Sequence, residues 1–153
     1  MNRETQKGFT LIELLLVIGI LVILITATIV AINPFRQFAL ANNASRFSGT
    51  ATIMDATYQN VVDNVGVFDC AAGTIPATAT NMGSGATDYN VCACVVPTYV
   101  STMPFDPQTG SYTDCATYNT GYSIARDATT GRITICAPDT QIPPEAADVC
   151  VTR

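Results

Sequence analysis

A single apolar run near the N-terminus limits the possible folds of this chain more than any other feature. Residues 9–32 read FTLIELLLVIGILVILITATIVAI and carry one charge, that of Glu13. At ~1.5 Å per residue, a helix of this length crosses the ~30 Å hydrocarbon layer of a membrane. A chain of 153 residues has no core wide enough to bury such a helix on all sides. We therefore interpret residues 9–32 as a transmembrane helix.

The residues before the run indicate its orientation. The leader reads MNRETQKG and carries Arg3 and Lys7 against one acid, Glu4. A secretory signal peptide has a shorter apolar region followed by a small-residue cleavage site, and this sequence has neither feature. Basic residues before a span keep that end in the cytoplasm. We expect a single-pass precursor in the cytoplasmic or inner membrane, with its N-terminus inside and the rest of the chain outside.

The junction between the leader and the run carries a family resemblance. Residues 7–13, KGFTLIE, resemble the processing site of type IV prepilins and of the related type II secretion pseudopilins. The resemblance implies that a prepilin peptidase cleaves after Gly8 and methylates the new N-terminus at Phe9. It also implies that Glu13 is required for assembly.

Pro34 should interrupt the helix, because it has no N–H for the Val30 carbonyl and disfavours helical geometry at Asn33. Over residues 33–66 helical periodicity resumes, with apolar residues at alternating spacings of four and three. We expect this amphipathic second half of the helix to face the protein's own sheet and to end near Gly66. The apolar stripe comprises Phe47, Ala51, Met54, Tyr58, Val61 and Val65.

The remainder, residues 67–153, is poor in large apolar residues. All seven Leu lie at or before Leu40, and only fourteen of these 87 residues are Ile, Val, Phe or Leu. So small a core needs covalent help, and an extracytoplasmic location permits disulfides. The six cysteines, all in this region, are Cys70, Cys92, Cys94, Cys115, Cys136 and Cys150.

We interpret these cysteines as three disulfides, although the sequence leaves all fifteen pairings open. On a strand, Cys92 and Cys94 would point to the same face and so reach two different partners. The pilin resemblance favours Cys136–Cys150 as the best single pair. A zinc site is not expected, because Cys92 and Cys94 are too closely spaced and the chain has no His.

The pattern of residues 67–153 predicts a small antiparallel sheet. Residues 121–126 and 132–137 read as a hairpin whose buried face carries Tyr122, Ile124, Ile133 and Ile135. Residues 71–88 read as a surface loop, residues 91–100 as an irregular or edge strand, and the C-terminal region as a loop. Residues 103–110, MPFDPQTG, resemble the turn that precedes the sheet in major pseudopilins and several pilins. The expected fold is α+β and pilin-like, with a long N-terminal helix packed on the sheet.

Composition and motifs argue against several functions. With a net charge of −5, the chain does not resemble a nucleic-acid binder. We find no catalytic constellation and expect neither a cofactor nor a metal. Some pseudopilins bind calcium in sheet loops, but Asp106, Asp114 and Asp127 match no such spacing and are interpreted as turn caps. The triplet at Asn43 fits the glycosylation pattern but lies in a predicted helix.

These observations favour a structural protein, not an enzyme. Its expected role is that of a subunit of a type IV pilus-like filament, serving motility, adhesion or DNA uptake outside the cell. The expected partners are copies of itself in a helical homopolymer, prepilin peptidase, a membrane assembly platform and, before assembly, membrane lipid. One alternative is the major pseudopilin of a type II secretion or competence machine, which would form a periplasmic filament. Another is a membrane-tethered tip adhesin or binding module.

Overall fold

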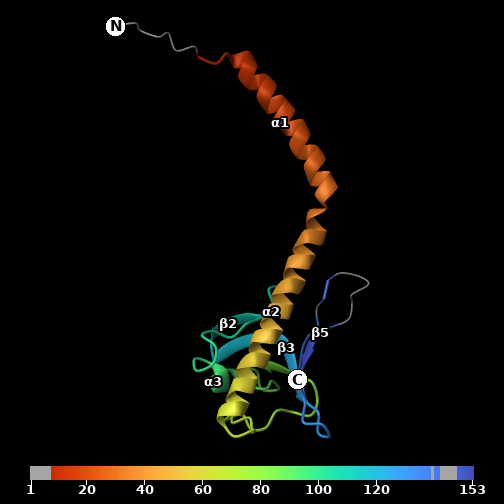
Figure 1. The fold of residues 1–153 in the computed structure, drawn as a ribbon. Helices are drawn as coiled ribbons and strands as arrows, with labels where there is room; N and C mark the ends of the chain where they lie inside the picture. Colours follow the sequence, from red (N-terminus) through yellow and green to blue (C-terminus); the bar gives the residue numbers. More distant parts are fainter. Residues whose placement is uncertain (1–7, 139, 142–147) are drawn as a thin grey trace, which may run out of the picture. The chain divides into compact units, whose positions relative to one another are not determined.

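The computed structural model describes residues 8–138, 140–141 and 148–153, so all of the expected leader except Gly8 lies outside the described residues. Two helices come first, α1 (Leu11–Ile32) and α2 (Pro34–Asp63). Antiparallel strands and one short helix follow, which confirms the α+β class. They are β1 (Thr80–Gly83), α3 (Cys92–Val95), β2 (Ser111–Asp114), β3 (Thr117–Arg126), β4 (Ile133–Ala137) and β5 (Val149–Thr152) (Figure 1).

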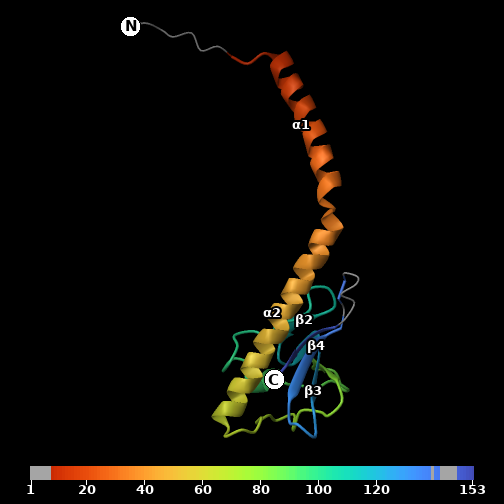
Figure 2. The same cartoon turned by 45° about the vertical axis from the view of Figure 1, so that its right-hand side comes forward.

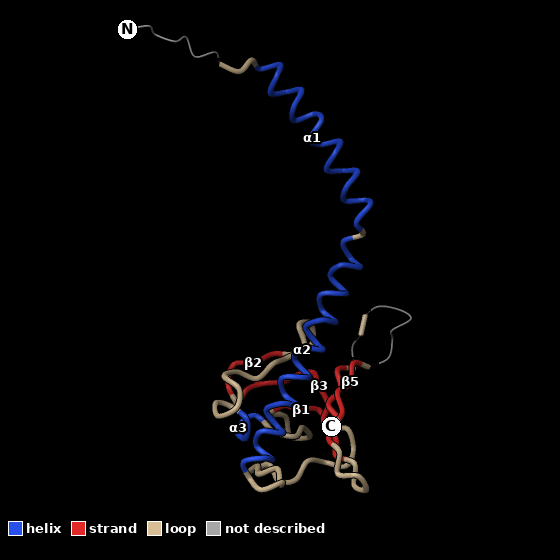
Figure 3. The backbone as a smooth tube through the Cα atoms, viewed as in Figure 1, coloured by secondary structure: helices blue, strands red, loops and turns tan. Residues whose placement is uncertain are grey.

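The helical hydrogen bonding is interrupted between α1 and α2. Asn33 adopts a left-handed conformation with φ 47° and ψ 79°, and Pro34 opens the next helix. Asn is one of the few residues that enter this region without a large steric cost, and Pro fits the first turn of a helix, where its missing N–H is not needed. The interruption expected at Pro34 therefore lies at the residue before it (Figure 3). The chain divides into two units nearby, the first ending at Gln37 and the second beginning at Phe38.

The buried face of α2 differs from the predicted apolar stripe. Phe47 and Val65 are 59% and 94% exposed, so the stripe is wrong at both ends. Threonines can lie on the buried face because their hydroxyl groups hydrogen-bond to carbonyls of the same helix. The hydroxyl of Thr57, for example, donates to the Ile53 carbonyl at 2.8 Å. Each such threonine can then turn its methyl group toward the core. The buried residues of α2 are Arg46, Gly49, Thr50, Ile53, Met54, Ala56, Thr57 and Asn60.

The C-terminal end of α2 lies close to its predicted position. The helix ends at Asp63, and the Gly66 N–H donates to the Val61 carbonyl at 2.8 Å. The side-chain amide of Asn60 then donates to the carbonyls of Asp69 and Cys94, both at 3.1 Å. Asn60 thus connects the last turns of α2 to the following loop and to α3.

The sheet has the strand order β1-β3-β4-β5, with β2 also paired to β3, and every pair is antiparallel. In the second unit it lies beside α2 (Figure 2). The predicted β3–β4 hairpin is confirmed, and its four expected inward side chains are buried: Tyr122, Ile124, Ile133 and Ile135. They join Ile53 and Met54 of α2 in a single core.

Three predictions about the rest of this unit are wrong. Residues 80–83 of the expected loop form β1, because Met82 is fully buried and the segment pairs with β3. Residues 92–95 of the expected strand form the helical turn α3, which buries Val95 and Cys92. Residues 149–152 of the expected C-terminal loop form β5, which pairs with β4. In β1 and β5 the partner strand, and not the local composition, determines the conformation.

An ion pair without exposure to water joins α2 to the 103–110 turn. The Nε of Arg46 donates to Oδ2 of Asp106 at 2.5 Å, and both side chains are 0% exposed. The remaining guanidinium nitrogens donate to Asn43 at 3.0 Å and to Asp106 and Gln108 at 3.3 Å. The second oxygen of Asp106 also accepts the backbone N–H groups of Gln108 and Thr109, at 2.8 and 3.0 Å. Both charges are therefore extensively hydrogen-bonded, which buried charges require.

Two glycines allow the turn to approach β3 closely. A Cβ on Gly110 would lie 2.7 Å from both the Asp106 nitrogen and the Thr120 carbonyl oxygen. Gly121 has φ +71°, and a Cβ there would lie 3.0 Å from Cβ of Asp106. The Asp106 N–H donates to the Thr120 carbonyl at 2.8 Å across this contact. The glycine that ends the predicted turn is thus required by the backbone of β3.

Replacing one member of the buried pair should destabilise the fold. Asp106→Asn retains an oxygen for the turn but leaves the Arg46 charge uncompensated, so we expect a loss of about 3 kcal/mol or more in unfolding free energy. Asp114→Asn is the matched control, because Asp114 also caps a turn but is exposed. Denaturant unfolding of the full chain in non-ionic detergent, followed by tyrosine circular dichroism, measures both variants.

The pH dependence provides an internal check. Burial by itself raises the pKa of Asp106, but the Arg46 guanidinium and two backbone N–H groups hold it below the ordinary 3.8. A lowered folded-state pKa stabilises the fold above the unfolded pKa, and this contribution is lost as the pH falls through the folded value. The difference in unfolding free energy between wild type and Asp106→Asn should therefore be largest near pH 7 and decrease in acid. A gap that stays constant down to pH 2 would contradict this assignment.

Candidate functional site

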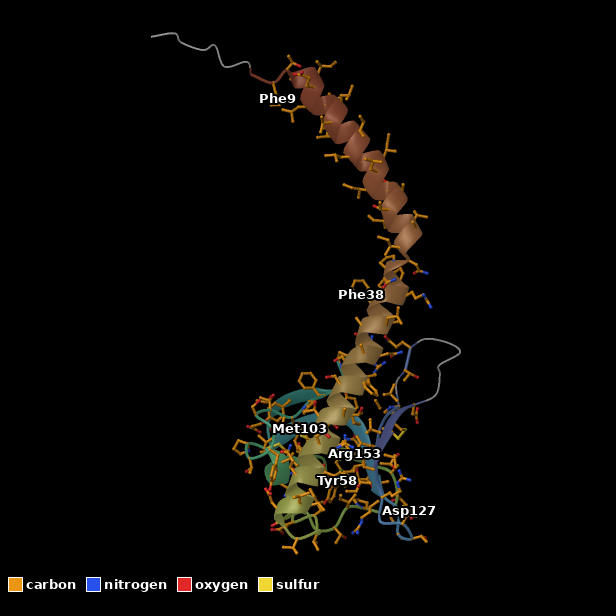
Figure 4. The ribbon with its side chains drawn as sticks, in the orientation of Figure 1. Phe9, Phe38, Tyr58, Met103, Asp127 and Arg153 are labelled. Atoms are coloured by element: carbon orange, nitrogen blue, oxygen red, sulfur yellow. A yellow bond between two sulfur atoms is a disulfide. The ribbon has the colours of Figure 1, made fainter. Side chains whose placement is uncertain are left out.

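The expected cleavage junction lies in extended chain before α1. Gly8 and Phe9 are exposed, Phe9 at 87%, and helical structure begins only at Leu11. A protease must bind the scissile peptide in a non-helical conformation, so this position suits processing. Phe9 projects beside the start of α1 (Figure 4).

The first turn of α1 is closed by a capping box between Thr10 and Glu13. The Thr10 N–H and hydroxyl both donate to Oε2 of Glu13 at 2.8 Å, and the Glu13 N–H donates to the Thr10 hydroxyl at 3.3 Å. This arrangement satisfies otherwise unpaired N–H groups at the helix start. Glu13 thus has a local structural role, and its carboxylate lies one turn from Phe9 along the chain.

Along α1 no residue is buried. Its surface consists almost wholly of Leu, Ile and Val, with side chains 49–80% exposed among the large apolar residues. By length and composition, it is the one helix of the described residues that could cross a membrane. So large an apolar surface requires a covering, which lipid or other apolar helices would supply.

The six cysteines form three disulfides in the second unit. The structure pairs Cys136 with Cys150, the pair that the sequence analysis favoured, at directly opposite positions of β4 and β5. Cys70 is bonded to Cys94, and Cys92 to Cys115. Cys92 and Cys94 do have different partners, but they lie on a helical turn and not on a strand.

The scattered acids act as turn caps. Asp114 accepts the N–H groups of Ala116 and Thr117 at 2.9 and 2.8 Å. Asp127 accepts those of Thr129 and Thr130, and these bonds, that from Thr130 foremost, lower its pKa. The interpretation of the acids as turn caps is confirmed. Within the described ranges, no three His, Cys, Asp or Glu side chains are grouped as a metal site would require.

One feature of the second unit was not anticipated from the sequence. An open hollow of about 650 Å³ lies on the solvent side of α2. Its walls include Tyr58, Tyr99 and Asp63, and an ion pair between Asp55 and Arg153 lies at its border. Tyr58 and Arg153 lie close together over α2 (Figure 4). Asp55, Gln59 and Asp63 are spaced four residues apart, so the sequence predicts that they share one face of α2. It does not show that residues 98–99 and 153 lie against that face.

The side chain of Asn43, whose triplet fits the glycosylation pattern, is engaged within the protein. Its side-chain oxygen accepts Arg46 Nη1 at 3.0 Å and the Gln141 N–H at 3.4 Å. It therefore holds the buried arginine and the segment before β5. The Arg46–Asp106 pair was also missed, because nothing local connects two residues 60 positions apart. The one available signal was a single arginine in an otherwise uncharged stretch of helix, between Arg36 and Asp55.

Comparison with known proteins identifies the N-terminal segment. Residues 3–29 match the family model of the prokaryotic N-terminal methylation motif, the signature of type IV pilin and pseudopilin precursors. No curated protein and no solved structure matches the chain. The motif points to a prepilin and to a structural subunit, not an enzyme. Together with the apolar α1, it fits a membrane-anchored precursor.

The disulfide pattern predicts which thiol each single replacement exposes. Alkylation of the wild-type protein without reduction should label no cysteine. In Cys70→Ser, the label should appear on Cys94, and in Cys115→Ser on Cys92, because these are their bonded partners. Fragmentation mass spectrometry locates the label. Labelling of Cys92 in the Cys70→Ser variant would show that the two pairs around α3 are exchanged.

Proposed function

We propose that this protein is the structural subunit of a type IV pilus-like filament. It enters the membrane as a prepilin, loses residues 1–8 and polymerises through its N-terminal helix. The match of residues 3–29 to the methylation motif carries the proposal. In this assignment residues 9–32 first span the membrane and then form the filament core. Residues 67–153, with the adjoining part of α2, form the extracytoplasmic domain.

Cleavage would create the charge that assembly uses. Hydrolysis of the Gly8–Phe9 bond adds one water, leaves a carboxylate on Gly8 and makes the Phe9 nitrogen an ammonium. In the precursor that nitrogen is an uncharged amide. The only lysine of the chain is Lys7, which leaves with the leader, and after Phe9 the first cation is Arg36. Within the apolar segment, the processed N-terminus is thus the only cation with which Glu13 can pair.

Pairing between subunits explains why Glu13 occurs in so apolar a helix. A carboxylate in a membrane helix is costly, up to roughly 2.5–3.5 kcal/mol on insertion scales at the helix centre, and Glu13 lies in the first turn of α1. An ammonium ~4 Å away, at an effective dielectric near 20, attracts it by about 4 kcal/mol before desolvation is subtracted. The capping box with Thr10 holds the same carboxylate in the single chain. We propose that the Phe9 ammonium of a neighbouring subunit becomes its partner during docking.

Two observations bear on the alternatives. The 103–110 turn resembles that of major pseudopilins, and its glycine and aspartate have well-defined roles, which supports a pseudopilin of a secretion or competence machine. Three disulfides in a small domain suit a subunit exposed outside the cell, which supports a pilus shaft. We favour the pilus. Retention of Glu13 favours a polymerising subunit over a tip adhesin.

Processing should leave a chain that begins at Phe9. Intact-mass analysis of sheared filaments should give the mass of residues 9–153 with three disulfides and one methyl group on the terminal nitrogen. An amine-reactive reagent should label the precursor at Met1 and Lys7, but the mature chain nowhere except its N-terminus. Filaments that contain Met1 would rule out the proposed processing.

Two variants separate the local role of Glu13 from its role between subunits. Glu13→Gln keeps an oxygen for the Thr10 capping box but removes the charge, whereas Glu13→Leu removes both. If charge pairing drives docking, both variants should insert and be cleaved after Gly8, yet accumulate in the membrane, with filament yield at least tenfold below wild type. Cell fractionation and immunoblotting of sheared material measure this.

The cleaved fraction serves as the control, since it should equal that of wild type in both variants. Normal filament yield from Glu13→Gln alone would mean that Glu13 acts only as a helix cap.

A further inference from the structure

The hollow on α2 combines an aromatic surface with negative charge. Tyr58 and Tyr99 are half-buried, while the carboxylates of Asp55 and Asp63 are exposed. Burial first, then a hydrogen bond to Asp63, and then the charges of Asp63 and Asp69 raise the pKa of the Tyr99 hydroxyl. The Asp55 carboxylate is already paired with Arg153. Asp63 therefore contributes the negative charge that no cation of the described residues balances.

The same unit carries a surface of opposite sign. Arg126 and Arg132 flank the turn of the β3–β4 hairpin and are both exposed. Arg126 donates to the Gly131 carbonyl at 3.3 Å, which holds its side chain over the turn. The hydrogen bonds of Arg132 within the described residues are made by its backbone: its N–H donates to the Thr130 hydroxyl at 3.4 Å, and its carbonyl accepts the Asp127 N–H at 2.9 Å. Asp127, at the hairpin end (Figure 4), directs one oxygen into the turn and offsets only part of this charge.

We propose that the hollow on α2 receives the β3–β4 hairpin of a second copy of this chain. This inference rests on the proposed filament and names a lateral contact within it. Arginine suits the hollow, because a guanidinium stacks on tyrosine rings and pairs with carboxylates. Apart from Arg36, which lies in the first unit, the arginines of the mature chain outside the hairpin are already engaged: Arg46 with Asp106 and Arg153 with Asp55. Among the described residues of the second unit, the cations without an ion-pair partner are thus Arg126 and Arg132 of the hairpin.

The geometry of such a contact agrees with polymer growth. Hollow and hairpin are different surfaces of one subunit, so each subunit donates a hairpin on one side and accepts one on the other. A heterologous contact of this kind repeats from copy to copy and generates an open helical array when the rotation does not close. The side chain of Val62, 74% exposed at the rim, adds apolar area to the contact.

A charge exchange tests the contact. Asp63→Arg and Arg132→Asp each place like charges opposite one another, and we expect each to lower filament yield at least fivefold at low ionic strength. The chain carrying both replacements restores opposite charges and should recover at least half of the wild-type yield. Asp148→Arg is the matched control, because it changes the net charge as Asp63→Arg does, at an exposed position outside the hollow. It should not lower the yield.

A second measurement keeps the test independent of folding. Co-expressed Asp63→Cys and Arg132→Cys chains should give a disulfide-linked dimer in filaments, whereas neither variant alone should. If all variants form filaments like wild type and no dimer appears, the contact is wrong while the proposed filament stands. If the wild-type chain itself forms no filaments, both proposals are wrong.

Discussion

Arg46 and Asp106 determine how the second unit is put together. Neither side chain has contact with water, and each would be strongly unfavourable without the other. Their pairing positions one helix against a turn 60 residues later in the sequence, and that turn against β3. The close approach of turn and strand explains the two glycines at positions 110 and 121. It also sets the rotation of α2: with Arg46 facing inward, Phe47 must face outward.

The orientation of α2 illustrates which features of the fold could be predicted from the sequence and which could not. The apolar run, the helix interruption and the β3–β4 hairpin are determined by neighbouring residues, so their patterns were informative. The buried face of α2 was misplaced because its polar residues find partners that periodicity cannot show: Thr57 in its own helix, Arg46 in a distant turn. Strands β1 and β5 are four residues each and owe their conformation to β3 and β4. The disulfide partners of Cys92 and Cys94 likewise depend on which distant segments the fold brings next to α3.

The candidate functional residues also include some that the sequence could predict and some that it could not. Gly8, Phe9 and Glu13 lie in one contiguous motif, so the sequence alone indicated the chemistry they suit. The hollow on α2 combines residues from three separate segments and became visible only in the folded chain. The segment that matches a family concerns processing, which many filament subunits share. In the proposed filament, features particular to this subunit would lie in the second unit, in surfaces such as the hollow and the hairpin.

The arrangement of disulfides determines what a single proteolytic cut can release. The loops closed by Cys70–Cys94 and Cys92–Cys115 overlap at α3, so together they span residues 70–115 without a gap. A protease that cuts any one peptide bond in this range leaves both fragments covalently joined. The Cys136–Cys150 bridge does the same for the segment between β4 and β5. A subunit cut once within these loops would keep all its parts. The segments that depend on an unbroken backbone are the chain before Cys70, the hairpin region between Cys115 and Cys136, and the three residues after Cys150.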